Sequence, residues 1–136
     1  MRNNISTILK KISELPKKER VLALQQNGTE ALKSVLQYCF HDGIKWLLPE
    51  GEVPYTPNLN EDQRNMFFNQ IRTLYLYVEG GNPNLKQIRR EQLFIALLES
   101  IDPEDAKLVV SIKDKKLPYK GINKEMVEQA FPGLLS

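Results

Sequence analysis

The amino-acid sequence predicts an all-α fold, a single compact bundle of about six or seven helices with one long Pro-rich loop. Apolar residues recur three and four positions apart along most of the chain, and this spacing places side chains on one face of an α-helix. Polar capping residues, prolines and glycines flank these stretches where helices begin and end. We find no strand pair and no internal repeat, so we expect one helical domain over residues 1–136.

Three helices are expected in the first third of the chain. An apolar stripe over residues 5–15 predicts a helix that ends before Pro16. Pro16 suits the first turn of a second helix, because the N–H that proline lacks is not bonded there. That helix should stop near Asn27. Asn27 and Glu30 form a capping-box pattern, which predicts a third helix that runs through Phe40.

The middle of the chain is expected to contain the long loop and two further helices. Residues 41–60 hold an Asp-Gly pair and three prolines, which predict a short helical turn and then an ordered loop. Asn60 and Gln63 match a second capping box, and the stripe after them predicts a long helix to Val78. Residues 85–100 become strongly apolar toward their end, so we expect the buried central helix there, with an exposed basic first half.

Two shorter helices are expected to complete the bundle. Asp102 supplies a capping oxygen, and Pro103 fits the first turn of a helix that continues to about Ile112. The last helix is predicted over residues 123–130, because the Pro-Gly pair that follows it ends regular structure.

Composition and motifs exclude several function classes. The longest apolar run, residues 93–98, is far shorter than the roughly 20 residues that cross a bilayer. The first residues lack the pattern of a secretory signal, so we expect a cytoplasmic protein without membrane contact. Cys39 is the single cysteine and His41 the single histidine, and no phosphate loop, dinucleotide fingerprint or zinc-protease motif is present. We therefore expect that the protein is not an enzyme and that it has no catalytic residue, no cofactor and no bound metal.

The positive charge gathers in two groups. Residues 113–124 carry five lysines against the single acid Asp114, a local net charge of +4 compared with +2 for the chain. Lysines and backbone N–H groups would converge here on one phosphate site. The candidate residues of this segment are Lys113, Lys115, Lys116, Lys120, Gly121, Asn123 and Lys124. Lys86, Arg89 and Arg90 form the second group, on one face of a helix. Either the two groups together follow a nucleic-acid backbone, or both are ordinary solvated surfaces.

Three stretches of the sequence carry a resemblance to a known family. They are ILKKISELPKKERVLALQQN, EALKSVLQYCFHDGIKW and VVSIKDKKLPYKGINKEMVEQAFPGLL. The chain resembles the N-terminal helical DNA-binding domain of ATP-dependent DNA ligases, especially those of T-even-type phages. The resemblance implies contacts between the segment 113–124 and the backbone of duplex DNA, without sequence specificity. It does not imply ligase activity, because the KxDG motif of the adenylated lysine is absent.

A different hypothesis makes the protein an adaptor that binds another protein. The chain also resembles small proteins of T-even-type phages, so a host or phage replication or transcription protein is the expected partner class. The Pro-rich segment contains four residues that could form an exposed anchor, Trp46, Leu47, Leu48 and Tyr55. The alternative is that these side chains fold back and cover the helical core.

Overall fold

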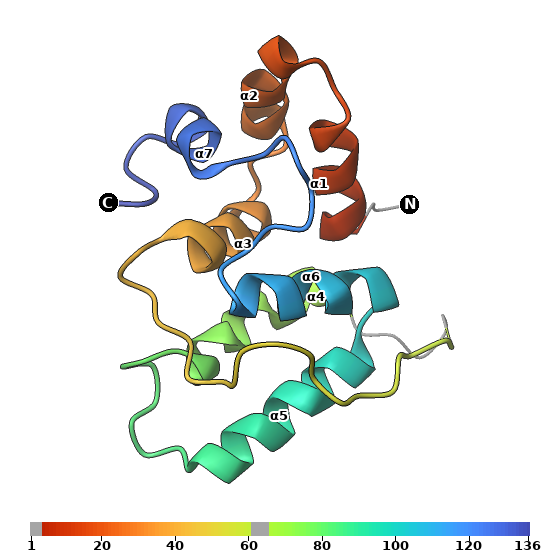
Figure 1. The fold of residues 1–136 in the computed structure, drawn as a ribbon, viewed down its shortest axis with the longest axis vertical. Coiled ribbons are helices and arrows are strands. Elements are labelled where there is room, and N and C mark those ends of the chain that lie inside the picture. The colour runs from red at the N-terminus through yellow and green to blue at the C-terminus, as the bar shows by residue number, and fades with distance from the viewer. Residues whose placement is uncertain (1–3, 61–65) are drawn as a thin grey trace.

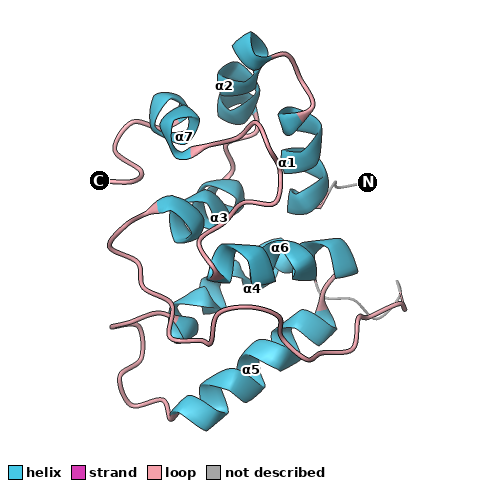
Figure 2. Cartoon of the chain, in the orientation of Figure 1, coloured by secondary structure: helices cyan, strands magenta, loops and turns pink. Residues whose placement is uncertain are grey.

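Helices joined by loops make up the computed structural model, which describes residues 4–60 and 66–136 (Figure 1). In chain order they are α1 (Ile5–Ser13), α2 (Lys17–Gln26), α3 (Glu30–Phe40), α4 (Phe67–Gln70), the 3-10 helix η2 (Ile71–Tyr77), α5 (Gln87–Ser100), α6 (Pro103–Lys113) and α7 (Lys124–Ala130). Figure 2 shows helices and loops throughout the described residues and no strand. The predicted all-α fold is confirmed.

The helix at the centre of the fold is α6 rather than α5, which corrects the prediction. α6 packs against α1, α3 and α5 (Figure 1). Its buried residues cover a wider arc of the helix than those of α5; they are Asp105, Ala106, Leu108, Val109, Ile112 and Lys113. α5 buries a single stripe that includes Phe94, and Ile88 near its start is 70% exposed. A helix with one apolar stripe belongs at the edge of a core.

The predicted long helix to Val78 is also wrong in part. Gln63, half of the proposed capping box, lies outside the described residues. After one turn of α4 the chain continues as the 3-10 helix η2, whose buried residues are Ile71, Leu74 and Tyr77. This spacing of three matches the three residues per turn of a 3-10 helix. The tighter winding directs the Tyr77 ring into the core. There it packs edge to face against Phe94, with 5.1 Å between the two ring centroids.

Caps define the helix ends largely as expected. Asp102 accepts a hydrogen bond at the start of α6, and Asn123 does the same for α7. The cap of α3 is Thr29, two residues after the predicted Asn27, because the Thr29 hydroxyl accepts from the backbone N–H of Leu32. The side chain of Asn27 instead donates to a carbonyl of α2.

The long loop over residues 41–60 crosses α5 and the last turn of α6. It opens with a single turn, in which the N–H of Ile44 donates to the carbonyl of His41 at 3.1 Å. Trp46 then pairs with Val78 as an isolated antiparallel bridge. The loop is therefore attached to the segment that follows η2.

Candidate nucleic-acid interface

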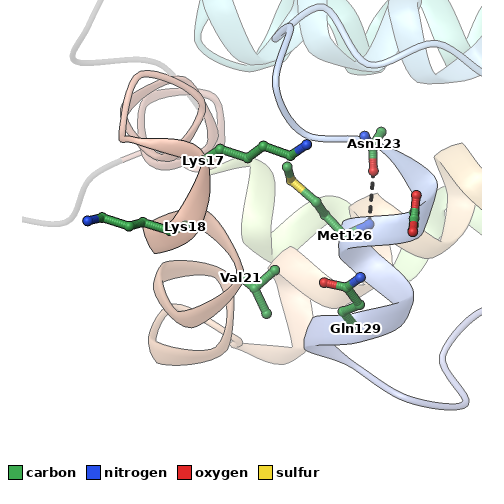
Figure 3. A pocket seen from close by; sticks show the side chains of 7 residues that line it. Lys17, Lys18, Val21, Asn123, Met126 and Gln129 are labelled. Atoms are coloured by element: carbon green, nitrogen blue, oxygen red, sulfur yellow. Dashed lines mark hydrogen bonds between the residues drawn. The ribbon is translucent and has the colours of Figure 1, made fainter.

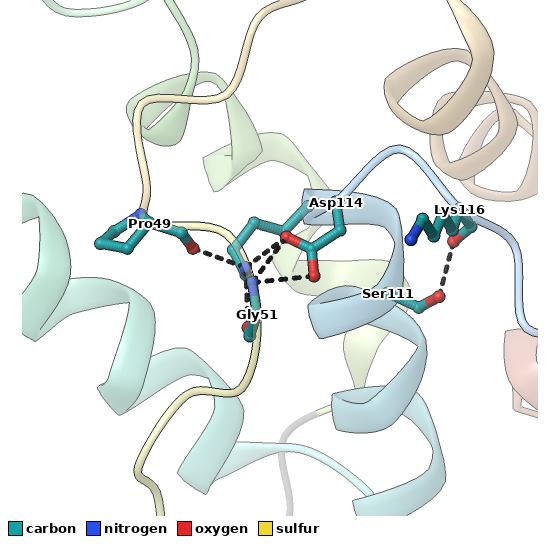
Figure 4. A network of polar contacts seen from close by, with 6 residues as sticks. Pro49, Gly51, Ser111, Asp114 and Lys116 are labelled. Carbon is teal, nitrogen blue, oxygen red and sulfur yellow. Dashed lines mark hydrogen bonds and ion pairs between the residues drawn. The ribbon is translucent and has the colours of Figure 1, made fainter.

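The structure buries Lys113, the first lysine of the predicted phosphate site. Its ammonium donates to the carbonyls of Pro49 at 2.7 Å and Gly51 at 3.0 Å, and to the carboxylate of Asp114 at 2.6 Å. Asp114 also accepts from the backbone N–H of Gly51 (Figure 4). Lys113 therefore fixes the long loop against α6 and is not available to a phosphate, which corrects the prediction.

Lys115 is directed inward as well. Its ammonium donates to three carbonyls at and beyond the end of α3, those of Tyr38 (3.3 Å), His41 (2.6 Å) and Ile44 (3.2 Å). A helix C-terminus leaves carbonyls without partners, and a lysine satisfies them. Burial lowers the pKa of Lys115. Lys124 remains at the surface but pairs with the Asp42 carboxylate at 2.6 Å, so its charge is partly neutralised.

The second basic group also contains both buried and exposed cations. Arg90 is only 6% exposed, and its guanidinium donates to the carbonyls of Leu76 and Leu85. Lys86 and Arg89 are exposed. Figure 1 places the start of α5 at the lower end of the molecule, whereas α7 and the loop before it lie in the upper half. The two predicted groups therefore do not form one continuous surface.

Lys116 and Lys120 do reach the surface. Between Lys120 and α7, Gly121 adopts a positive φ of 105°, and its carbonyl accepts from the Arg20 guanidinium at 3.3 Å. This bond attaches the loop before α7 to α2. The ring of Tyr119 is half-buried, and burial raises its pKa to about 12. Charge, rather than an aromatic surface, is what this loop presents to solvent.

The proposed protein-binding anchor folds back onto the core. The Trp46 indole donates to the carbonyl of Tyr38 at 3.1 Å and packs edge to face against Tyr38 and Phe94. Leu48 and Tyr55 are partly buried against the core. Leu47 is half-buried, and its N–H donates to the carbonyl of Tyr77. Trp46, Leu48 and Tyr55 therefore cover the core and Leu47 is held by a backbone hydrogen bond, so the exposed-anchor hypothesis is corrected.

A different group of lysines lies exposed around the junction of α1 and α2. We call this surface the basic end, and it consists of Lys10, Lys11, Lys17, Lys18 and Lys120. None of the five forms an ion pair with another described residue. Residues 10–20 carry five cations against two acids, a net charge of +3. The contact between Arg20 and Gly121 brings Lys120 to this junction.

Part of the basic end borders a groove between α2 and α7. The groove has a volume of about 590 Å³, and Val21 and Met126 contribute apolar lining. Figure 3 shows Lys17 reaching across the groove toward Asn123 and Met126, whereas Lys18 points away from it. The positive surface therefore extends beyond the groove. Glu125 supplies the carboxylate of the lining.

The reactive residue types of the chain are held in structural roles. His41 Nδ1 accepts from the N–H of Gly43 at 2.9 Å, so its Nε2 carries the proton and faces the carbonyl of Ser136 at 3.1 Å. Cys39 is buried, and burial raises its pKa to about 12, which keeps the thiol protonated. Within residues 4–60 and 66–136, no group of three or more histidine, cysteine or acidic side chains is placed to hold a metal ion. None of the helices described has the length and apolar character needed to span a membrane.

Comparison with known proteins identifies a family. The model of the "Family of unknown function (DUF6433)" matches residues 8–119, from within α1 to the loop that follows α6. No curated protein and no solved structure matches the chain. The resemblance to the ligase DNA-binding domain therefore stays a prediction. The match covers most of the chain, including four of the five lysines of the basic end, and the protein therefore belongs to the DUF6433 family.

Proposed function

We propose that the protein is a non-enzymatic module that binds the phosphate backbone of duplex DNA through the basic end. The proposal rests on one observation, five exposed lysines around a single helix junction without an ion-pair partner among the described residues. Cations that are not neutralised within the protein displace the counterions of a phosphate backbone, and this release drives binding. The resemblance to the ligase domain implies the same ligand, duplex DNA, but through residues 113–124, of which the basic end contains only Lys120.

The surroundings of these lysines favour backbone contacts over reading or stacking of bases. Lysine is a flexible point charge that contacts phosphates without distinguishing sequences. Proteins that hold single strands usually add exposed aromatic side chains on which bases stack. Tyr119 is half-buried, and the exposed aromatic Tyr75 belongs to η2 rather than to the basic end. We therefore expect duplex binding that is independent of sequence.

A salt titration tests the proposal. Fluorescence anisotropy of a labelled duplex should show an affinity that falls by a factor on the order of 100 between 50 and 200 mM salt, if about four phosphates are contacted. An equally long single strand and a second duplex of unrelated sequence serve as comparisons. Absence of duplex binding at low salt would contradict the proposal.

Two charge-reversal variants locate the site. Lys17→Glu/Lys18→Glu changes the basic end, and Lys86→Glu/Arg89→Glu makes the same change of charge at the start of α5. The first variant should reduce the salt slope by about two and the affinity at low salt at least roughly tenfold. The second should retain most of the slope. Equal losses in both variants would show that only net charge matters and would reject the basic end as the site.

A further inference from the structure

A mostly apolar pocket, open to solvent on one side, lies between the long loop and α5, away from the basic end. Its volume is about 190 Å³. Leu48 and Val53 of the loop and Phe94 and Ile95 of α5 supply apolar walls, while Glu52 and Glu91 contribute carboxylates. This pocket is built by the Pro-rich segment whose large side chains cover the core, so the segment serves a second purpose.

The loop wall of the pocket is fixed by side chains of α5 and α6. The buried Lys113 ammonium binds the carbonyls of Pro49 and Gly51 on one side. On the other side the Glu99 carboxylate accepts from the N–H of Thr56 at 2.7 Å. The Gln87 amide, in addition, donates to the carbonyl of Leu47 at 2.7 Å. A wall held at several points is organised before a ligand arrives, which lowers the entropy cost of binding.

Size and charge restrict the occupant. The pocket is smaller than the roughly 300–1,000 Å³ of typical small-molecule sites, so a nucleotide or similar cofactor does not fit. One large apolar side chain fits this volume. Residues 47–59 contain two acids, Glu50 and Glu52, and no lysine or arginine. The nearby cation Lys113 is buried and paired with Asp114. The rim is therefore negative and complementary to a positively charged segment.

We propose that this pocket binds a peptide segment of a partner protein, with one large apolar side chain inserted between Val53 and Ile95 and neighbouring lysines or arginines facing Glu52 and Glu91. This gives the adaptor hypothesis a site different from its original anchor residues. The site is independent of the basic end, because the two surfaces share no residue.

A pair of synthetic peptides tests the proposal. One has a central phenylalanine with two lysines on either side, and the other has glutamates in place of the lysines. The lysine peptide should shift the NMR methyl signals of Val53 and Ile95 and bind at least about tenfold more tightly than the glutamate peptide. Equal affinities, or shifts that leave these two methyls unchanged, would overturn the proposal.

Variants separate the pocket from the rest of the surface. Ile95→Arg places a cation in the apolar wall and should abolish binding of the lysine peptide, whereas Ile88→Arg, on an exposed part of the same helix, should leave it unchanged. Glu52→Lys should weaken binding about tenfold through charge reversal at the rim. Circular dichroism of each variant checks that the fold is kept. If sedimentation shows a dimer that Ile95→Arg dissociates, the pocket is a self-association surface and the partner proposal is wrong.

Discussion

Replacing Lys113 with methionine removes the ammonium that holds the long loop against α6 while keeping an apolar stem of similar length. The wild-type ammonium makes three hydrogen bonds, to Pro49, Gly51 and Asp114. Bonds to charged groups contribute about 1.5–3 kcal/mol each, and breaking a fully buried ion pair costs about 3–5 kcal/mol. The side chain of Asp114 is 17% exposed, and Pro49 and Gly51 are exposed. Water can therefore replace some of the hydrogen bonds that the ammonium made to these three residues. We therefore expect a loss of about 2–4 kcal/mol.

Urea denaturation followed by circular dichroism measures this loss. Lys116→Met is the matched control, because it makes the same chemical change at an exposed lysine three residues later and should cost less than about 0.5 kcal/mol. Adding Asp114→Asn to Lys113→Met should restore part of the stability, since the charge left without its partner is then removed. A loss below about 1 kcal/mol, or equal losses for Lys113→Met and Lys116→Met, would refute the structural role of the buried ammonium.

Three further predictions concern individual residues, namely Gly121, Asp105 and Cys39. Gly121→Ala should destabilise the protein by about 1–3 kcal/mol in thermal unfolding, because φ is 105° and a Cβ atom would lie 2.9 Å from the Arg20 guanidinium; an unchanged transition would contradict this. Burial raises the pKa of Asp105 in the folded state, so its contribution to stability is greatest below the ordinary carboxyl pKa of about 4 and is lost as the pH rises through the folded-state value. Asp105→Asn should flatten this decline in denaturation curves recorded across the acidic range, and a variant that declines as steeply as the wild type would show that other groups cause it. Cys39 should resist a thiol reagent in the native protein at mildly alkaline pH and react after unfolding in urea, whereas rapid native labelling would contradict its burial.

Local sequence signals predicted the helices well where packing and capping agreed with them. The stripes of α1, α3 and α6 and the caps Asp102 and Asn123 follow from spacing and side-chain chemistry alone. The 3-10 winding of η2 did not follow from the same rules. An apolar stripe at spacings of three and four fits both helix types over two turns, and the contact between Tyr77 and Phe94 is long-range.

The inward orientation of three cations was beyond sequence reasoning. Lys113, Lys115 and Arg90 look like surface residues in a charged stretch, and lysine and arginine are rarely buried. Most of their acceptors are backbone carbonyls, which every residue carries and which no residue type reveals. For Lys113 and Lys115 these carbonyls belong to segments more than 60 residues earlier in the chain. Only the fold brings donor and acceptors together.

The basic end, by contrast, could have been predicted in part from the sequence, because two pairs of lysines flank Pro16. Lys10 and Lys11 precede Pro16, and Lys17 and Lys18 follow it directly. A proline at the start of a helix predicts that the two lysine pairs lie on either side of a tight junction. The arrival of Lys120 at the same junction depends on the contact between Gly121 and Arg20, and this part required the structure.

The most direct measurement for the proposed DNA contact is a map of backbone amide shifts in an NMR titration with a short duplex at low salt. The basic end predicts the largest changes at residues 10–20 and 119–121, and little change in the first turn of α5. Changes concentrated around Lys86 and Arg89, or an unaltered spectrum at saturating duplex, would contradict it.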